Sequence, residues 1–406
     1  MLNAGQQSIS DKAFDWFFYG SDQVFEIDGL AGTGKSYLMG QLLARLGLNK
    51  NQYMPMAYTG QAAIFMRTKG FITAKSIHAS LYEVVEVEDT SELTKAYGLP
   101  TKHKEFRKRL WIDPEVRLFF IDEAYMVPDY MVSDILSFGV KVIVCGDCHQ
   151  LPPINSNPGF LISNKVHHLT EIMRQSEDDP ILYIADRAMK GLAIHNGVYG
   201  NSVLVAYDDE LTPLMIAKAE AIICGTNKTR STLNSFVRSL ARINYDLPIM
   251  GERIICRNNN WDMSVGGIAL SNGLTGTVVS NPDVSSFSSD GTFKISFKPD
   301  LSPDVFYDVP VNYQYFTAPF EERKEIKENM KKGWLHGELF EFAYASTTHL
   351  AQGAEYSGGI YIEEFLRSQI QNQLNYTGIT RFKKWMIYLK KKNKTIYVPD
   401  LNKIFS

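Results

Sequence analysis

The stretch IDGLAGTGKSYL, Ile27 to Leu38, limits what this chain can fold into more than any other part of it. Gly29 is followed by four residues and then by Gly34, Lys35 and Ser36, which completes the pattern G-x-x-x-x-G-K-[ST] of a phosphate-binding loop. Glycines allow backbone N–H groups to turn inward around an anion. The pattern predicts that Lys35 reaches the β- and γ-phosphates of a nucleotide and that Ser36 binds Mg²⁺. The loop residues expected to contact the nucleotide are Gly29, Gly32, Thr33, Gly34, Lys35 and Ser36.

The segments on either side of this loop match what such a loop requires. Val24 to Ile27 is a short, mostly apolar run that predicts a strand, and Tyr37 to Leu48 has apolar residues at helical spacing. The phosphates would therefore lie at a helix N-terminus. Further strands are expected at Tyr53–Thr59, Leu118–Ile121 and Val140–Val144. Nearly continuous apolar strands are typical of a parallel sheet covered by helices on both faces, so the sequence predicts a doubly wound α/β fold.

The chain of 406 residues is long enough for two domains. We expect a first α/β domain at residues 1–190 and a second at residues 191–406. Segment 82–114 is polar and too long for a simple connection, so it predicts a small inserted subdomain. A second insertion, at about 276–338, combines short alternating strands with a charged helix and predicts a small β-barrel or sheet.

Net charge and cysteine content narrow the class of protein. The formal net charge is −3, so a nucleic-acid partner would be held in a local groove and not by a general positive field. Four cysteines in a chain of this length are too few for a disulfide framework and indicate a reducing compartment. Cys145 and Cys148 form a C-x-x-C, but the sequence offers no second such pair or nearby His pair, which disfavours a zinc or redox site. The sequence begins without a secretory leader and has no apolar run near 18 residues, so we expect a cytoplasmic protein of a bacterium or phage-infected host, not bound to a membrane.

Two further strand ends carry polar side chains suited to nucleotide chemistry. The apolar run in FFIDEA ends in Asp122 and Glu123, at the carboxyl end of a strand, where ligands bind in open α/β sheets. Asp122 is expected to hold Mg²⁺, directly or through water, and Glu123 to orient and deprotonate the attacking water. In VCGDCHQLPPI, Gln150 is a neutral donor and acceptor placed where it could sense a γ-phosphate or its water.

The motifs GLAGTGKS, IDEA and GDCHQLPPI, in this order, resemble motifs I, II and III of the superfamily 1 helicases. Other segments extend the resemblance over nearly the whole chain: LNAGQ, AYTGQAA, SIHASL, LTEIMRQ, TNKTRSTLN, YASTTHLAQGAE and NYTGITRFKK. The combination of TGQAA with GERIICRNNN, LSNGLTGTV and a β-rich insertion is similar to the branch that contains RecD and phage Dda. The resemblance departs at Leu350 and Ala351, where the family often has a basic and a hydroxyl residue.

The resemblance implies two RecA-like P-loop domains with ATP and Mg²⁺ bound between them. Gln6 would contact adenine, while Arg174 and Arg381 would reach the γ-phosphate. The residues that the motifs assign to DNA are Thr59, His78, Thr348 and His349. The catalytic set would be Lys35, Asp122, Glu123, Gln150, Arg174 and Arg381, with Ser36 and Asp122 as the Mg²⁺ ligands.

The function implied is that of an ATP-dependent DNA helicase that moves 5′→3′ along single-stranded DNA. Tyr97 or Phe106 in the first insertion is a candidate for a ring that holds the fork open. Expected partners are single-stranded DNA, junctions of single- and double-stranded DNA, and single-strand-binding, replication or recombination proteins; the chain is expected to be a monomer. Two alternatives stay open, an RNA helicase and a translocase that displaces bound proteins without separating strands. A metabolic P-loop kinase is disfavoured because it needs neither GDCHQLPPI nor TGITR.

Overall fold

The computed structural model describes residues 1–88, 102–171, 173, 179–243, 245–282, 290–331, 335–366, 369–393 and 395–399. Contacts divide the chain into two compact units. The first contains Met1–Leu81, Leu110–Thr226 and Ser346–Pro399, and the second contains Asn227–Ala345 together with the segment Tyr82–Arg109. Within the described residues, no helix is both long and apolar enough to cross a membrane.

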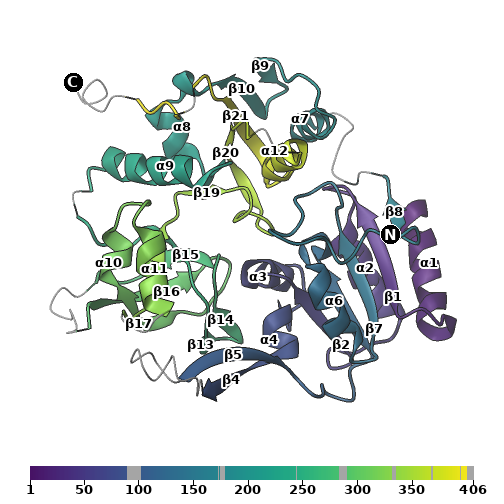
Figure 1. Ribbon diagram of the computed structural model, residues 1–406. Coiled ribbons are helices and arrows are strands. Elements are labelled where there is room, and N and C mark those ends of the chain that lie inside the picture. Colours follow the sequence, from purple (N-terminus) through teal and green to yellow (C-terminus); the bar gives the residue numbers. More distant parts are fainter. Residues whose placement is uncertain are drawn as a thin grey trace. The chain divides into compact units, whose positions relative to one another are not determined.

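The first unit contains a six-stranded parallel sheet in the order β3-β2-β6-β7-β1-β8 (Figure 1). Its strands are β1 (Val24–Gly29), β2 (Tyr53–Ala57), β3 (Lys75–Ser76), β6 (Leu118–Asp122), β7 (Lys141–Gly146) and β8 (His167–Leu169). All residues of β6 are buried. Because alternate side chains of a strand point to opposite faces, this burial means that both faces of the sheet are covered.

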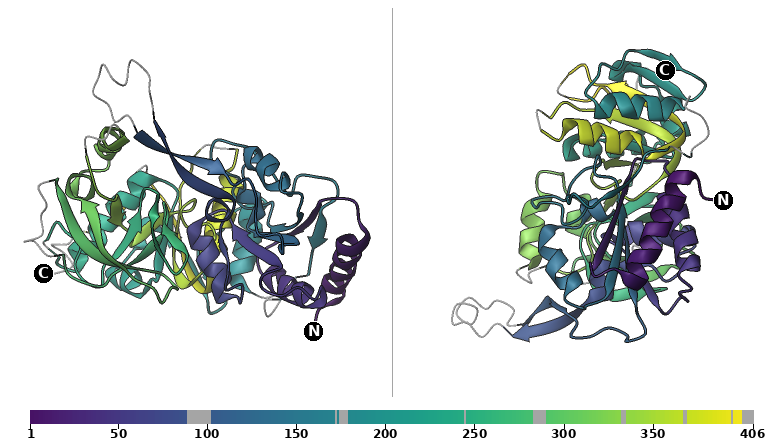
Figure 2. Two further views of the ribbon diagram at one scale, coloured as in Figure 1. Left: turned by 90° about the horizontal axis from the view of Figure 1, so that it is seen from below. Right: turned by 90° about the vertical axis from the view of Figure 1, so that its right-hand side faces the viewer.

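Helices surround this sheet as a doubly wound fold requires. They are α1 (Ala4–Tyr19), α2 (Lys35–Arg45), α3 (Gly60–Thr68), α4 (Ile77–Leu81) and α6 (Asp129–Leu136), with a short 3-10 helix η1 (Ala124–Met126). The apolar stripes of α1 and α2 join one hydrophobic core with Ile27 of β1 and Phe120 of β6. The purple helix α1 lies beside α2 and β8 (Figure 2). This packing fixes the start of α2 against the carboxyl end of β1.

The same unit contains a second six-stranded sheet, in the order β19-β11-β20-β21-β10-β9. Its strands are β9 (Gly197–Tyr199), β10 (Val203–Tyr207), β11 (Ala221–Cys224), β19 (Ala345–Thr347), β20 (Tyr356–Glu363) and β21 (Phe382–Lys390). Strands β11, β20, β21 and β10 run parallel, and β9 is antiparallel to β10. The helices are α7 (Pro180–Met189), α8 (Pro213–Lys218) and α12 (Gln371–Ile379), and η2 (Asp208–Glu210) is a 3-10 helix.

Gly378 explains how closely α12 packs on this second sheet. A Cβ at Gly378 would lie 2.1 Å from the ring of Tyr361 in β20, so a larger residue would push the helix away. Tyr361 itself is completely buried. The glycine in TGITR is therefore required by packing, and it sets the position of Arg381 three residues later.

The second unit is built on a five-stranded antiparallel sheet in the order β17-β16-β15-β12-β18, drawn in green in Figure 1. Its strands are β12 (Arg253–Cys256), β15 (Thr275–Val278), β16 (Thr292–Pro299), β17 (Phe306–Asn312) and β18 (Phe340–Phe342). Aromatic rings fill its core, and Phe297 meets Phe340 edge to face at 5.1 Å. The helices are α9 (Asn227–Leu240), α10 (Tyr313–Thr317) and α11 (Arg323–Lys331).

Two hairpin-like strand pairs complete the second unit. Strands β4 (Tyr82–Glu88) and β5 (Lys102–Lys108) pair antiparallel, and so do β13 (Asn260–Val265) and β14 (Ile268–Leu270). Figure 2 shows β4 and β5 as a long twisted ribbon. The candidate ring Phe106 lies on β5 and is 43% exposed, whereas Tyr97 lies outside the described residues.

The predicted α/β class with parallel sheets is confirmed, with two differences in detail. The run FEFAYAS, expected to be one late strand of the second α/β series, forms two strands in different sheets, β18 and β19. The β-rich part also begins before residue 276, because β12 pairs with both β15 and β18. Both differences have the same cause. An apolar run predicts a buried strand, but it does not predict which sheet that strand joins.

Candidate active site

The phosphate-binding loop between β1 and α2 has the backbone that its glycines predict. Gly32 and Gly34 adopt φ values of 88° and 78°, in the left-handed region that favours glycine. Helix α2 begins directly after Gly34, so the free N–H groups of its first turn face the loop. A Cβ at Gly34 would lie 2.6 Å from Gln6 Nε2, so a larger residue would displace the Gln6 side chain. The loop can therefore receive an anion at the helix N-terminus.

Two lysines and a hydroxyl lie at the mouth of this loop. Lys35 Nζ donates to the carbonyl oxygens of Gly29 at 2.5 Å and Leu30 at 3.2 Å. Lys69, just after α3, donates from Nζ to Ser36 Oγ at 3.1 Å. Burial lowers the pKa of Lys69, and the negative charges of Asp122 and Glu123 oppose that shift. An ammonium group thus lies among the Ser36 hydroxyl and two carboxylates, the kind of oxygen set that also suits Mg²⁺.

Glu123 has a strained backbone at the end of β6. Its φ of 52° and ψ of 40° lie in the left-handed region, which costs a non-glycine residue roughly 1–3 kcal/mol. Its N–H donates to Asp122 Oδ1 at 3.0 Å, and its Oε1 lies 3.9 Å from Arg381 Nη1. Burial raises the pKa of Glu123, although Arg381 opposes the shift. A raised pKa suits a general base, because the pKa of an effective general base lies near the working pH.

The turn after β7 connects the loop to α12. Asp147 is 1% exposed, and its Oδ2 accepts a hydrogen bond from the Tyr376 hydroxyl at 2.7 Å. The Tyr376 oxygen in turn accepts from the N–H of Ala31 in the loop at 3.1 Å. The backbone N–H of His149 donates to Asp147 Oδ1 at 3.0 Å. The carboxylate and the neighbouring thiol raise the pKa of the His149 side chain to about 10.

Arg381, at the end of α12, reaches the same turn from the second sheet. It is 3% exposed, and its Nη2 donates to Gln150 Oε1 at 3.2 Å. Two bonds at Leu151 reinforce this connection: its N–H donates to Thr377 Oγ1 at 2.9 Å, and its carbonyl accepts from Gln352 Nε2 at 2.9 Å. Residues of the second sheet and α12 are therefore hydrogen-bonded to the segment that carries Gln150.

These groups enclose a cavity of about 320 Å³. Its walls carry four cations and three carboxylates from both sheets, which fits a polyphosphate chain with a divalent cation. The lining residues are Ala31, Gly32, Gly34, Lys35, Ser36, Tyr37, Lys69, Asp122, Glu123, Gln150, Met173, Glu355, Thr380, Arg381 and Lys383.

Gln6 lies behind the loop. It is completely buried, and its Nε2 donates to Thr33 O at 3.1 Å. Its Oε1 accepts from the N–H of Asn3, the residue that caps α1, at 3.2 Å. In this conformation Gln6 holds the loop to the start of α1. Arg174 lies outside the described residues.

The residues predicted to contact DNA differ in exposure. Thr59 caps α3, with Oγ1 accepting from Ala62 N at 3.1 Å, and is half-buried. His78 in α4 and His349 are also half-buried, and burial lowers the pKa of both. Thr348 is completely buried and donates from both N and Oγ1 to Cys224 O. The Thr348 side chain therefore supports the loop from inside and does not lie on its surface.

Several residues of the site were not predicted from the sequence. Lys69, Glu355 and Lys383 line the cavity, and Asp147 and Tyr376 link its walls. Asp147 and Tyr376 lie within the motifs GDCHQLPPI and NYTGITR, so the motifs could have identified them as site residues. Lys69 follows the AYTGQAA segment after a full helix, and no motif marks it.

The loop, the acidic strand end and the two mainly parallel sheets define an α/β fold of the RecA-like P-loop class. Residues 1–195 match the AAA domain family. Among solved structures, the chain is similar to the Pif1 helicase of Candida albicans, with a TM-score of 0.51 and 16% identity over 96% of this chain and 95% of that one. It is similar to a Bacteroides Pif1 bound to single-stranded DNA, with a TM-score of 0.53 and 16% identity over 100% and 96%. A Pif1 structure concerned with DNA unwinding at forked duplexes gives a TM-score of 0.55 and 18% identity over 100% and 96%. No curated protein matches the sequence. These similarities confirm the fold that the sequence resemblance predicts.

Proposed function

We propose that this protein is an ATP- and Mg²⁺-dependent DNA helicase that translocates 5′→3′ on single-stranded DNA. The observation that carries the proposal is the position of Arg381. This buried arginine comes from the second sheet, bonds to Gln150 of the first, and lies 3.9 Å from Glu123 in the cavity. A nucleotide in that cavity would contact both sheets, so its binding and hydrolysis can change how they are held together.

The residues around the cavity suit hydrolysis of the γ-phosphate. Lys35 would bind the β- and γ-phosphates, and Ser36 with Asp122 would hold Mg²⁺, which would neutralise phosphate charge. Glu123 would orient the attacking water and accept its proton. Gln150 and Arg381 would then face the γ-phosphate, where an arginine stabilises charge that develops in the transition state.

We propose that four residues of the first unit and one ring of the second act on the DNA. Thr59, His78 and His349 are half-buried and so retain exposed surface that a strand could contact, and we assign Thr348 an indirect role beneath His349. In the second unit, the exposed Phe106 ring meets Trp261 edge to face at 5.1 Å. We propose that the β4–β5 insertion presents this ring to the DNA fork, where stacking on a base is worth roughly 1–3 kcal/mol.

We extend the proposal to organisation and partners. The chain acts as a monomer with RecA-like domains at 1–190 and 191–406. The first domain carries an insertion at 82–114, and the second carries a β-rich insertion around the predicted span of about 276–338. Its partners are single-stranded DNA and fork junctions. The solved Pif1 structures named above, which contain single-stranded DNA or concern forked duplexes, support this choice of partner.

The experiment compares ATP hydrolysis with and without single-stranded DNA for the wild type and Lys35→Ala. We expect DNA to stimulate wild-type hydrolysis and Lys35→Ala to abolish it. Lys50→Ala, at an exposed lysine beyond α2, is the matched control and should behave as the wild type. Hydrolysis by Lys35→Ala at the wild-type rate would refute the site assignment.

A further inference from the structure

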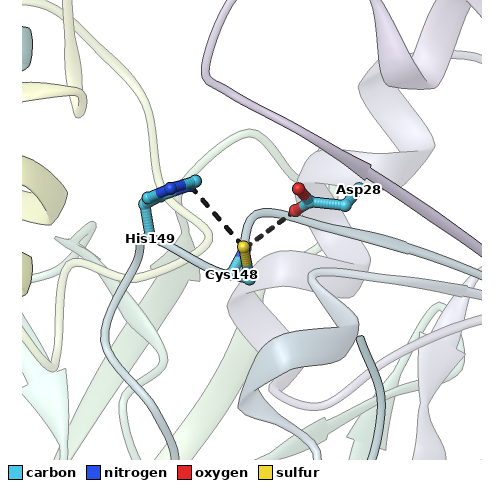
Figure 3. Close-up of side chains that lie close together, drawn as sticks. All are labelled: Asp28, Cys148 and His149. Atoms are coloured by element: carbon cyan, nitrogen blue, oxygen red, sulfur yellow. Dashed lines mark hydrogen bonds between the residues drawn. The ribbon is translucent and has the colours of Figure 1, made fainter. Parts of the chain in front are cut away.

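A second cluster of chemically reactive side chains lies behind the phosphate-binding loop. Asp28 is near the end of β1, and Cys148 and His149 follow β7. One ligand atom from each of the three lies within 4.8 Å of the others (Figure 3). None of the three is among the residues that line the nucleotide cavity. The pairing of β1 with β7 brings them together, because Asp28 is in register with Gly146.

The cluster has a buried anchor and a more open side. Asp28 is 4% exposed, while Cys148 and His149 are half-buried. The N–H of Cys148 donates to Asp28 Oδ1 at 2.9 Å, and Cys148 Sγ lies 3.6 Å from His149 Nδ1 (Figure 3). On the other side, His168 Nδ1 lies 3.0 Å from Asp28 Oδ2. The carboxylate is therefore fixed in orientation by two partners before any ligand binds.

We propose that Asp28, Cys148 and His149 form a binding site for one transition-metal ion of the Zn²⁺ type. A thiolate, an imidazole nitrogen and a carboxylate oxygen are the three ligand types that Zn²⁺ takes, and the thiolate excludes a preference for Mg²⁺. Three protein ligands leave a fourth tetrahedral position for water. His168 would act as the outer partner that orients the Asp28 carboxylate.

The proposed site uses only one of the two cysteines of the C-x-x-C pattern. Cys145 is completely buried within β7, and it is absent from the cluster. The ligands come instead from Cys148 with its sequence neighbour His149 and from a strand over one hundred residues earlier, which spacing alone does not reveal.

An ion bound at this site would affect the nucleotide cavity through Asp147. His149 Nδ1 also lies 3.4 Å from Asp147 Oδ1, and the other oxygen of Asp147 accepts from the Tyr376 hydroxyl. An ion on His149 would remove one partner of this buried carboxylate and would fix the turn that precedes Gln150. Metal binding is therefore expected to slow hydrolysis, a consequence that rests on the function proposed above.

The direct test is a titration of untagged protein with Co²⁺ in excess Mg²⁺, followed by absorption. Co²⁺ replaces Zn²⁺ at such sites, and a cysteine ligand gives thiolate-to-cobalt charge transfer, which oxygen ligands at the nucleotide site cannot give. We expect this band to saturate at one ion per chain in the wild type. It should be lost in Cys148→Ser and kept in Cys145→Ala, which removes the neighbouring thiol of the same C-x-x-C.

Two further variants keep the test decisive if Cys148→Ser folds poorly. Asp28→Asn retains an acceptor for the Cys148 N–H, and His149→Gln changes a half-buried side chain. Each should weaken Co²⁺ binding by at least about 10–100-fold, the cost typical of losing even an outer partner. Absence of a thiolate band in the wild type, or a band that survives in Cys148→Ser and disappears in Cys145→Ala, would overturn the proposal.

The coupling to hydrolysis has its own readout. Stoichiometric Zn²⁺ should lower the wild-type rate by roughly 5-fold or more, the lower end of typical coupling between two sites. In the same amount of Zn²⁺, Cys148→Ser should hydrolyse ATP at the rate that this variant shows without metal. Equal inhibition of both proteins would overturn the coupling. A chain without any ATPase activity would refute the proposed function instead, and the Co²⁺ titration would still decide whether the metal site exists.

Discussion

Arg381 Nη2 donates to Gln150 Oε1 at 3.2 Å, which joins the end of α12 to the turn after β7. The two residues are 231 positions apart in the sequence and both are almost completely buried. A guanidinium in this position faces the nucleotide cavity while the backbone carbonyl of Thr377 holds its Nε at 3.0 Å. The arginine is therefore already oriented before a nucleotide binds.

Arg381→Lys tests that orientation, because lysine keeps the charge and loses the planar fork. We expect the turnover number for ATP to fall by roughly 10³-fold, the lower end of the effect of an arginine finger, with nucleotide affinity much less changed. Steady-state hydrolysis and titration with a fluorescent ATP analogue measure the two quantities. Lys384→Ala, at an exposed neighbour, is the control. A turnover number within tenfold of the wild type would contradict the assignment.

Glu123→Gln separates binding from chemistry. The amide keeps the size of the side chain but cannot accept a proton from water. Turnover should fall by roughly 10²–10⁴-fold, the usual contribution of a general base, while ATP still binds. Single-turnover hydrolysis alongside nucleotide binding checks this, with Glu115→Gln at an exposed position as the control. Loss of binding together with turnover would show that Glu123 is instead required to build the site.

Tyr376→Phe removes the hydroxyl between Asp147 and the loop. The buried Asp147 carboxylate would lose a 2.7 Å hydrogen bond, and the Ala31 N–H would lose its acceptor. A buried polar group left without its partner costs about 1–3 kcal/mol, so the free energy of unfolding should fall by that amount. Urea unfolding measures it, and Tyr19→Phe at an exposed position should change stability by less than about 0.5 kcal/mol. Equal stability of the two variants would contradict the linking role of Tyr376.

The second unit contains a buried carboxylate whose titration should be visible in stability. Glu341 is 3% exposed, and although burial raises its pKa, the guanidinium groups of Arg230, Arg257 and Arg323 lower it from 4.5 to about 2. Because the folded-state pKa lies below the unfolded value, the stabilisation is complete above pH 4.5 and is lost as the pH falls towards 2. At 1.36 kcal/mol per pKa unit this amounts to roughly 3 kcal/mol.

Glu341→Gln provides the comparison for this pH dependence. The variant should be destabilised at neutral pH by roughly 3–5 kcal/mol, because the buried Arg230 and the half-buried Arg257 and Arg323 lose their counter-ion. The gap between wild type and variant should shrink as the pH falls from 4.5 towards 2, since the wild-type carboxylate becomes neutral in that range. Urea unfolding at several pH values gives the gap. A gap that stays constant would show that the three arginines do not stabilise the Glu341 charge.

Local patterns in the sequence predicted the parts of the site that are built from neighbouring residues. The glycine pattern predicts a tight turn followed by a helix from Tyr37, and the structure has a left-handed turn at Gly34 with α2 beginning two residues earlier, at Lys35. Asp122 and Glu123 follow directly from a buried strand that ends in two acids. In each case one short segment supplies both the backbone geometry and the functional atom.

Contacts made across the chain were not predictable in this way. The hydrogen bond between Tyr376 and Asp147 joins residues 229 positions apart, and no periodicity records such a pairing. Lys69 reaches Ser36 only because α3 ends beside the loop. The burial of Thr348 likewise depends on its two bonds to Cys224 O on a neighbouring strand. These features need the topology of the sheets and not only the motifs on their strand ends.

The most direct measurement of the central claim is strand separation on duplexes that carry either a 5′ or a 3′ single-stranded tail, with ATP and Mg²⁺. We predict ATP-dependent unwinding of the 5′-tailed duplex and no unwinding by Lys35→Ala. Unwinding from the 3′ tail alone would contradict the polarity, and preference for an RNA tail would favour the RNA alternative. DNA-stimulated hydrolysis without separation of either duplex would contradict the helicase and favour a translocase that displaces bound proteins.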